Sequence, residues 1–199
     1  MIWAMILGAG KSQRMGKPKL LLPFGEKTII ETVIDNLIRS KAENILAVLG
    51  SKWKKIEKKI KKSPLKMTVN PHFQRGMLSS VQWGFKALPE NTQAVLIVLG
   101  DQPAVSTDII NKIIEAFQMT RKGIVLPVYK NNRGHPVLID MKYRAEVETL
   151  SPDIGLRGLV YGHPEDVLEV KVDTPSILKD INDLEDYKKE LLRSKEKTE

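Results

Sequence analysis

A glycine loop near the N-terminus combines backbone freedom with positive charge. Gly8 and Gly10 follow a short apolar run, and Arg14, Lys17 and Lys19 come soon after them. Glycines let a backbone approach a ligand closely and adopt positive φ where needed, and consecutive N–H groups in such a turn form a concavity that binds anions. The cationic side chains add attraction for phosphate. The loop from Gly8 to Lys19 therefore predicts a binding site for a triphosphate.

The spacing within this loop excludes two commoner phosphate-binding motifs. A Walker A loop would need its first glycine at Met5 if Gly10 were its second. A dinucleotide-binding fingerprint would need a third glycine where Gln13 stands. The loop must therefore belong to another class of nucleotide site.

A carboxylate after a buried run is the second group that could do chemistry. Ala94–Leu99 is apolar, and Asp101 follows it closely. A buried strand that ends in a turn would also give this pattern. In an α/β sheet, however, ligands bind beyond the carboxyl ends of the strands. A carboxylate there can hold Mg²⁺, which bridges phosphate oxygens and offsets charge as pyrophosphate leaves. We therefore predict that Asp101 is a metal ligand.

Short apolar runs supply the strands that must position these groups. Each run is rich in Val, Ile or Leu without polar alternation, which is typical of strands covered on both faces. The runs are Ile2–Leu7, Ile45–Leu49, Met67–Val69, Ala94–Leu99, Ile124–Val128 and Val167–Val172.

Amphipathic helical patterns lie between these runs. Thr28–Ile38 places its apolar residues on one face, and Thr28 with Glu31 fits a capping box. Thr107 or Asp108 could cap a later helix. The repeated strand–helix order predicts an α/β protein, a three-layer α/β/α Rossmann-like fold with a mostly parallel sheet.

Composition limits the class of protein further. The 199 residues include no cysteine, which excludes disulfides, thiolate zinc sites and a cysteine nucleophile. No apolar run approaches the ~18 residues of a membrane span, and the N-terminus lacks the pattern of a secretory signal. We expect a cytoplasmic protein with one domain over residues 1–190 and a polar, frayed tail over residues 191–199.

The formal charge of +8 invites the idea of nucleic-acid binding. Much of the excess lies between Lys52 and Lys66, where Trp53, Ile56 and Ile60 recur at helical spacing. This pattern favours a surface helix with a lysine-rich outer face. Because no aromatic–basic RNA-binding pattern accompanies it, we predict neither a nucleic acid nor a membrane as partner.

The glycine loop resembles the signature L-x-[AG]-G-x-S-x-R-M-G-x-x-K of the MobA-like nucleotidyltransferases. The matching residues are Leu7, Ala9, Gly10, Ser12, Arg14, Met15, Gly16 and Lys19. The phrase from Leu99 to Pro103 is similar to the family's metal-binding turn, and the segment from Gly76 to Ser80 is similar to its base-reading element. The resemblance implies that these nucleotide-binding residues are Leu7, Gly8, Ala9, Gly10, Ser12, Arg14, Lys19, Asn70, Gly76, Ser80 and Gly100.

Later phrases resemble the molybdenum cofactor cytidylyltransferase branch of that family. Residues 133–138 match its R-G-H-P-V-L phrase, and residues 153–157 resemble G-D-x-G-A-R with two departures, Pro152 and Leu156. The resemblance implies acceptor-binding roles for Gln102, Pro103, Gly134, His135 and Arg157. A turn-forming role for His135 stays open.

The closing phrase of the family commonly supplies a second metal ligand. Here Asp180-Ile181-Asn182 stands where the family has D-I-D. The implied metal ligands are therefore Asp101 with Asp180 or Asn182, and the metal is Mg²⁺, for which Mn²⁺ could substitute. Arg14, Lys19 and Asp101 are the implied catalytic residues.

Together the resemblances imply CTP:molybdopterin cytidylyltransferase activity, with molybdopterin cytosine dinucleotide and pyrophosphate as products. Ala9 stands where the guanylyltransferase branch keeps glycine, and its methyl group favours CTP over GTP. Transient contact with a molybdoenzyme or its chaperone would follow. Three alternatives stay open: another NTP such as GTP, another phosphate acceptor, or a non-catalytic accessory protein that binds nucleotide or cofactor.

Overall fold

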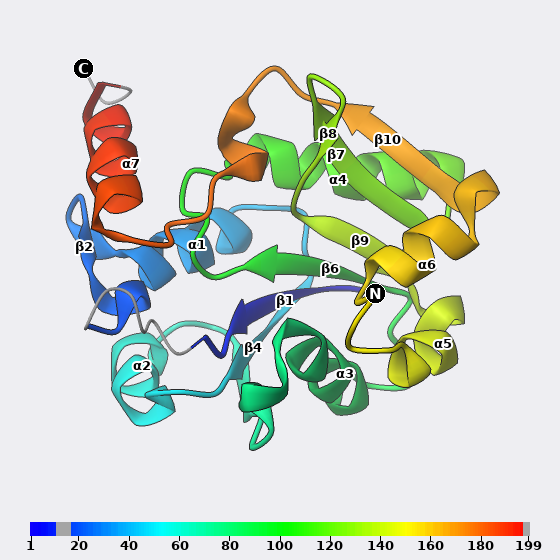
Figure 1. Ribbon diagram of the computed structural model, residues 1–199, viewed down its shortest axis with the longest axis horizontal. Coiled ribbons are helices and arrows are strands. Elements are labelled where there is room, and N and C mark those ends of the chain that lie inside the picture. Colours follow the sequence, from blue (N-terminus) through cyan, green and yellow to red (C-terminus); the bar gives the residue numbers. More distant parts are fainter. Residues whose placement is uncertain (11–16, 197–199) are drawn as a thin grey trace.

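The structure, a computed structural model, describes residues 1–10 and 17–196. The predictions for Ser12 and Arg14, together with the matches at Met15 and Gly16, lie outside the described residues. Figure 1 shows a central sheet with helices packed around it.

The sheet has the strand order β10-β7-β9-β6-β1-β4-β5, with β8 paired to β7. Its parallel strands are β1 (Ile2–Gly8), β4 (Asn44–Leu49), β5 (Lys66–Val69), β6 (Ala94–Leu99), β7 (Ile124–Tyr129) and β10 (Val167–Lys171). Every apolar run that the sequence predicted as a strand is therefore a strand. The predicted mostly parallel sheet is confirmed.

Two strands of the main sheet were missed from the sequence, and the longer of them is β9. β9 (Val137–Asp140) lies antiparallel between β6 and β7, with Val137 opposite Ile97. It follows Pro136 directly, and its first residues were assigned to the phrase over residues 133–138, so no strand was predicted there. Three further pieces are shorter still: β2 (Pro23–Phe24) and β3 (Lys27–Thr28) form a hairpin, and β8 (Asn132–Arg133) pairs with β7.

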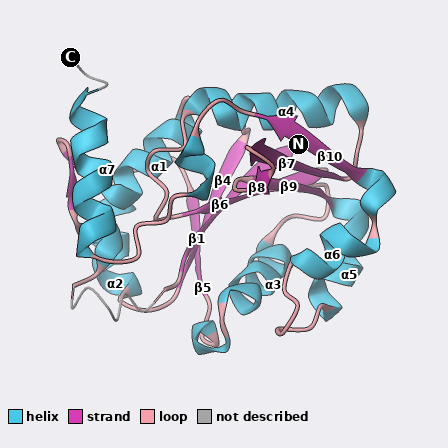
Figure 2. Cartoon of the chain, turned by 45° about the horizontal axis from the view of Figure 1, so that its top comes forward, coloured by secondary structure: helices cyan, strands magenta, loops and turns pink. Residues whose placement is uncertain are grey.

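The helices cover both faces of the sheet (Figure 2). On one face, α1 (Ile29–Ile38), α2 (Trp53–Ile60) and α4 (Thr107–Thr120) share an apolar core with the sheet. On the other face, α3 (Met77–Ala87), α5 (Arg144–Thr149) and α6 (Arg157–Gly162) do the same. Successive residues of β1 enter opposite cores, Ala4 the first and Met5 the second, as the period of a strand requires. The three-layer α/β/α fold is confirmed.

The edge strands differ from the prediction of strands covered on both faces. In β5, Met67 is exposed, and in β10 Glu169 is exposed. The helix layers end before the sheet edges, so these strands keep one face in water. Their apolar runs reflect β-propensity as much as burial.

The helix caps follow the sequence with one correction. The backbone N–H of Thr28 donates to the Glu31 carboxylate at 2.9 Å, which confirms the capping box at α1. Helix α4 is capped by Ser106 and not by Thr107 or Asp108, because the Ser106 hydroxyl accepts from the Ile109 N–H. The lysine-rich helix is also confirmed, since α2 buries Ile56 and Ile60 and exposes most of its lysines.

The C-terminal segment is more ordered than expected. α7 (Leu184–Glu196) includes residues 191–196, for which we expected a frayed tail. The Tyr187 hydroxyl donates to the Pro23 carbonyl at 2.6 Å, and Leu191 packs against the core. These contacts stabilise a helix whose polar sequence alone suggested fraying. Among the described residues, no helix has the length and apolarity needed to cross a membrane.

Short 3₁₀ turns carry several of the connections. They are η2 (Lys19–Leu21), η3 (Phe73–Arg75), η4 (Met141–Tyr143), η5 (Pro164–Asp166) and η6 (Pro175–Leu178). Two of them matter for the site: η2 begins at Lys19, and η6 leads directly into Asp180.

Candidate functional site

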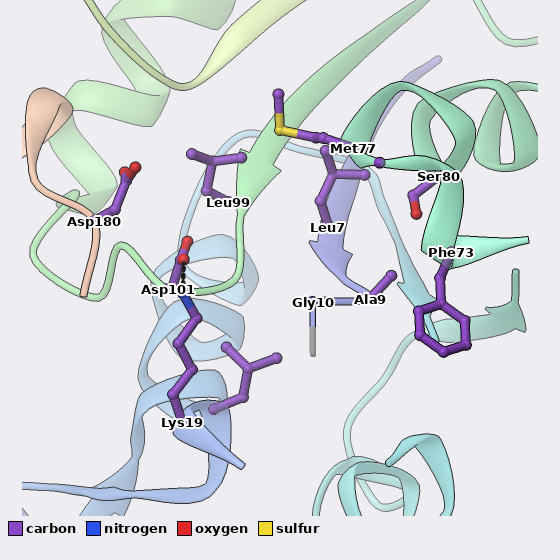
Figure 3. Close-up of a pocket in the computed structure, with 13 residues that line it drawn as sticks. Leu7, Ala9, Gly10, Lys19, Phe73, Met77, Ser80, Leu99, Asp101 and Asp180 are labelled. Atoms are coloured by element: carbon purple, nitrogen blue, oxygen red, sulfur yellow. Dashed lines mark hydrogen bonds and ion pairs between the residues drawn. The ribbon is translucent and has the colours of Figure 1, made fainter. Parts of the chain in front are cut away.

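A pocket of about 270 Å³ opens at the carboxyl ends of β1 and β6 (Figure 3). This is the edge at which α/β sheets bind ligands. The predicted site residues that line it are Leu7, Gly8, Ala9, Gly10, Lys19, Gly76, Ser80, Asp101 and Asp180. Residues from five separate parts of the chain therefore meet where the sequence predicted a nucleotide site.

One side of this pocket, here called the acidic end, consists of Lys19, Asp101 and Asp180. The Lys19 ammonium forms an ion pair with the Asp101 carboxylate and donates to the Ile181 carbonyl at 2.9 Å. The Asp101 carbonyl in turn accepts from the Ile181 N–H at 3.1 Å. Lys19 and Asp101, which are 82 residues apart in sequence, are thus fixed against the segment that carries Asp180.

Asp180 is held from behind by Gln102. The Gln102 amide donates to the Asp180 carboxylate at 2.7 Å and to the Ile177 carbonyl at 3.3 Å. Burial and the neighbouring Asp101 charge raise the pKa of Asp180, while the Gln102 hydrogen bond and the Lys19 charge oppose this rise. Two carboxylates therefore share a partly buried space in which a cation would relieve their repulsion.

The structure places the two candidates for a second metal ligand differently. Asp180 lines the pocket together with Asp101, whereas Asn182 is exposed and not among the described lining residues. Asn182 instead donates its backbone N–H to Asp186 at 3.0 Å, at the start of α7. The arrangement favours Asp180 over Asn182.

Two carboxylates suit Mg²⁺ or Mn²⁺ better than a metal that needs a full set of protein ligands. Within residues 1–10 and 17–196, no three His, Asp or Glu side chains gather as a metal site would require. Mg²⁺ usually keeps waters and takes one or two carboxylates plus the phosphates of a substrate. The pair Asp101 and Asp180 fits that donor set.

The predicted acceptor residues Gly134 and His135 support this end without lining the pocket. The His135 N–H donates to the Ile177 carbonyl at 3.0 Å, and a Cβ at Gly134 would lie 2.3 Å from the same oxygen. Only glycine allows this approach. Burial lowers the pKa of His135 to about 4, against the opposing effect of the Asp101 charge. Its imidazole is therefore neutral near pH 7, and the pair forms the turn against which Ile177 rests.

The other predicted acceptor residues lie elsewhere. Gln102 and Pro103 are buried, and Gln102 contacts Asp180 from outside the pocket. Arg157 is exposed at the start of α6, on the face of the sheet covered by α3. None of the three is among the described residues that line the pocket. Their contact with an acceptor stays a prediction.

The opposite side of the pocket, here called the apolar end, consists of Leu7, Ala9, Phe73 and Met77 (Figure 3). Phe73 and Met77 were missed from the sequence, although both lie in the segment between Asn70 and Ser80 that resembled a base-reading element. Leu20 and Leu99, also missed, line the pocket as well. The sequence did not mark these four apolar residues as part of a site, because apolar residues at strand and helix ends are equally typical of a core.

Ala9 has little freedom at the apolar end. A Cβ at Gly50 would lie 2.8 Å from the Ala9 Cβ and 2.7 Å from the Phe73 Cβ. The absence of a side chain at Gly50 thus lets Ala9 and Phe73 approach one another. Ala9 is 8% exposed and lines the pocket. Its position is therefore set by close packing.

Asn70 organises the start of α3. Its side-chain amide donates to the hydroxyls of Ser79 and Ser80, each at 3.0 Å, and its oxygen accepts from the His72 N–H at 2.8 Å. Asn70 is buried and is not a described lining residue, whereas Ser80, to which it donates, does line the pocket. A direct nucleotide contact for Asn70 stays a prediction. Gly76 caps α3 with φ of 95°, a conformation that favours glycine.

The loop glycines have different reasons for being glycine. Gly8 is packed, because a Cβ there would lie 3.1 Å from Leu49 and 3.3 Å from Leu20. Gly10 is exposed, and a Cβ would meet nothing within 4 Å. Gly100 is buried outside the pocket lining, and its N–H donates to the Leu7 carbonyl at 3.1 Å. None of the three has positive φ, so close approach alone explains Gly8 and Gly100, while the binding role of Gly10 stays a prediction.

The site therefore presents carboxylates and a lysine on one side and an apolar surface with a serine on the other. Such a site suits a ligand with phosphates at one end and a flat ring at the other. A profile of the MobA-like NTP transferase domain matches residues 4–167 of this chain. The chain belongs to the MobA-like NTP transferase family. It is a nucleotidyltransferase, as the sequence indicated.

Two relatives show the breadth of this family. The molybdenum cofactor cytidylyltransferase of Escherichia coli is 31% identical over 136 residues, which cover 68% of each chain. The nicotine blue oxidoreductase of Paenarthrobacter nicotinovorans is 28% identical over 165 residues, covering 78% of this chain and 79% of its own. Members with different named activities thus share this sequence pattern.

Solved structures share the fold over nearly the whole chain. The crystal structure of Rv0371c from Mycobacterium tuberculosis superposes with a TM-score of 0.86 at 25% identity, covering 96% of this chain and 97% of its own. A second structure of that protein, a complex with manganese, has a TM-score of 0.80 at 23% identity, with 96% of this chain and 98% of its own covered.

Proposed function

We propose that this nucleotidyltransferase is a CTP:molybdopterin cytidylyltransferase, which transfers CMP to the phosphate of molybdopterin and releases pyrophosphate. The observation that carries the proposal is the polarity of the pocket, with Asp101 and Asp180 at one end and the closely packed Ala9 at the other. The relative in E. coli, a molybdenum cofactor cytidylyltransferase, supports the choice of substrates.

The reaction needs positioning more than it needs a base. An oxygen of the acceptor phosphate forms a bond to the α-phosphorus of CTP, and the bond from that phosphorus to the bridging oxygen breaks. Pyrophosphate leaves with the electron pair. Because a phosphate monoester is already ionised at neutral pH, no side chain has to remove a proton. The protein's contribution is orientation and neutralisation of charge.

The acidic end supplies the charge that this transfer requires. Asp101 and Asp180 would hold Mg²⁺, with Mn²⁺ as a substitute, and the metal when bound would neutralise charge on the phosphates. The Lys19 ammonium lies beside the Asp101 carboxylate. From there we propose that it binds oxygens of the β- and γ-phosphates. We assign Arg14 and Ser12 to the same phosphates from the resemblance alone.

The apolar end would hold the base. The backbone at Gly8, Ala9 and Gly10 approaches the pocket directly, and the Ser80 hydroxyl offers a polar group to a base edge. The Ala9 methyl group narrows the space beside Phe73, so we propose that it favours a pyrimidine over a purine. We also propose that the protein acts in the cytoplasm and that a molybdoenzyme or its chaperone receives the product.

Turnover with purified components tests the proposal. The protein would be incubated with Mg²⁺, molybdopterin and each NTP in turn, and pyrophosphate release would be measured. We expect kcat/KM for CTP to exceed that for GTP by at least about tenfold. Turnover with GTP alone would contradict the cytidylyl assignment. Pyrophosphate release with a different phosphate ester, and none with molybdopterin, would reassign the acceptor.

Binding without turnover would point to the accessory role. If the wild type binds CTP but releases no pyrophosphate with any acceptor, the protein carries nucleotide or cofactor and does not catalyse. Calorimetric titration of CTP into the same preparation distinguishes this result from inactive protein.

A further inference from the structure

We propose that Gln102 is a positioning residue that holds the Asp180 carboxylate at the pocket it shares with Asp101 and thereby sets the affinity of the site for a divalent cation. The inference rests on the proposed function in one respect, because it takes Asp101 and Asp180 as the metal ligands. It is distinct from the acceptor-binding role that the family resemblance implied for Gln102.

The orientation of the Gln102 amide follows from its partners. The Asp180 carboxylate oxygen lies 2.7 Å from its nitrogen and the Ile177 carbonyl oxygen lies 3.3 Å from it. Both partners are acceptors. If the amide were turned over, its oxygen would face these two oxygens without a proton between them. The nitrogen must therefore point toward Asp180.

The burial of Gln102 fits a role in holding the Asp180 carboxylate. Its side chain is 2% exposed, and its oxygen, also buried, accepts no hydrogen bond from any described residue. A buried amide that leaves one polar atom without a partner costs stability. The side chain thus places its N–H group on the Asp180 carboxylate and the Ile177 carbonyl, the two contacts that tie it to the segment carrying Asp180.

The hydrogen bond links two segments that each carry a carboxylate. Asp101 adjoins Gln102 in sequence, and Asp180 is 78 residues further along from Gln102. The Ile181 N–H bond to the Asp101 carbonyl, at 3.1 Å, joins the same two segments through the backbone. The backbone contact fixes the distance between the segments, while the Gln102 contact fixes the direction of the Asp180 side chain.

A donor at this position also suits the charge. The Gln102 amide does not titrate, so it can donate to the Asp180 carboxylate wherever that group is ionised. It also adds no net charge beside the metal. Hydrogen-bonding partners of metal-ligating groups typically change metal affinity by 10–100-fold when they are removed. Loss of the Gln102 donor should therefore act on metal affinity before it acts on the binding of nucleotide.

The test compares Gln102→Met with Gln82→Met. Methionine keeps the length of glutamine but cannot donate. Gln82 is a matched control, because its amide donates only to backbone carbonyls, those of Val147, Glu148 and Leu150, at 3.2 to 3.3 Å. Mn²⁺ binding to the nucleotide-free protein would be measured by the loss of the free-ion spin-resonance signal, and the Mg²⁺ dependence of pyrophosphate release would be measured alongside.

We expect Gln102→Met to raise the Kd for Mn²⁺ by at least about tenfold and to raise the half-saturating Mg²⁺ concentration similarly. At saturating Mg²⁺, kcat should recover most of the wild-type value. Gln82→Met should leave the Kd unchanged even if its thermal stability falls. Equal Kd values for Gln102→Met and wild type would overturn the inference, as would an equal loss in both variants or a wild type that binds no Mn²⁺.

The proposed function and the positioning role of Gln102 would be disproved by different results. The Mn²⁺ titration uses no nucleotide, so an absence of CTP turnover would count against the proposed function alone. Conversely, cytidylyl transfer with a Gln102→Met variant whose metal affinity is normal would keep the proposed function and reject the role of Gln102.

Discussion

The two ends of the pocket are held in place by different forces. At the acidic end, directed hydrogen bonds and an ion pair join Lys19, Asp101, Gln102 and Asp180. At the apolar end, Ala9 and Phe73 are placed by contact against Gly50, and Asn70 is the main polar support. We therefore expect a larger side chain to disturb the acidic end only where its new atoms would meet a backbone oxygen. The apolar end should respond chiefly to changes of volume.

The largest effect is expected from Asp101→Asn. The substitution preserves shape but removes the charge that pairs with Lys19 and would bind the metal. We expect kcat/KM for pyrophosphate release to fall by about 100- to 1,000-fold, while CTP binding without metal changes little. Asp108→Asn, an exposed carboxylate at the start of α4, is the control. Activity within tenfold of wild type would remove Asp101 from the proposed mechanism.

Gly134→Ala should disturb the acidic end through packing alone. Its new Cβ would lie 2.3 Å from the Ile177 carbonyl oxygen, so the segment that carries Asp180 must move. We expect the free energy of unfolding to fall by about 2 kcal/mol, measured by denaturant titration, together with weaker Mn²⁺ binding. Gly162→Ala is a matched control, because a Cβ there comes no closer than 3.9 Å to its nearest neighbour. A stable Gly134→Ala variant with normal metal affinity would show that Ile177 does not position Asp180.

Ala9→Gly tests the volume argument at the apolar end. Removing the methyl group beside Phe73 should widen the pocket for a purine. We expect the ratio of kcat/KM for CTP to that for GTP to fall by about tenfold, with Mn²⁺ binding unchanged. The ratio is its own control, since general damage lowers both activities. An unchanged ratio would mean that another residue selects the base.

The smallest effect should come from a cluster away from both ends. Asp166 accepts from the Tyr143 hydroxyl at 2.6 Å and forms an ion pair with Lys142 at 2.7 Å. Although its burial opposes the shift, these partners lower the pKa of Asp166 to about 2. A lowered pKa stabilises the fold above the unfolded-state pKa, and the contribution is lost as pH falls through the folded-state value.

Asp166→Asn should therefore lose about 1 kcal/mol of stability at pH 7 and lack the part of the acid dependence that lies between about pH 4 and pH 2. Denaturant titrations at several pH values measure this. Both ends of the pocket should keep their properties, including the CTP to GTP ratio and the Mn²⁺ affinity. A change in either would connect this cluster to the site.

Much of the fold could be predicted because its signals are local. Apolar runs gave the strands, and the spacing of Thr28 and Glu31 gave a helix start. β9 escaped because it begins after Pro136 within a segment interpreted as a family phrase, and because its antiparallel pairing with β6 and β7 depends on tertiary contacts. The helical C-terminal segment escaped because its stability comes from tertiary contacts of Tyr187 and Leu191, which no local pattern reports.

The site divides in the same way. Gly8, Lys19 and Asp101 follow from position at strand ends and from charge. The choice of Asp180 over Asn182 depends on which side chain turns into the pocket, and the task of Gln102 depends on a contact across 78 residues. Neither is encoded in the spacing of neighbouring residues. The family phrase pointed to Gln102 as an acceptor-binding residue, which stays a prediction, whereas the positioning role proposed above rests on its contact with Asp180.

The reversed direction of β9 has a consequence for how this site can change over evolutionary time. In the parallel strands, the loop that leaves each strand reaches the ligand edge. In β9 it is the loop that enters the strand, carrying Gly134 and His135, that reaches this edge. Insertions after β9 should therefore be neutral to catalysis, whereas insertions before it would reshape the acidic end. Because β9 runs in the opposite direction, the loop before it, and not the loop after it, is the one in which natural variation could change the substrate that the site accepts.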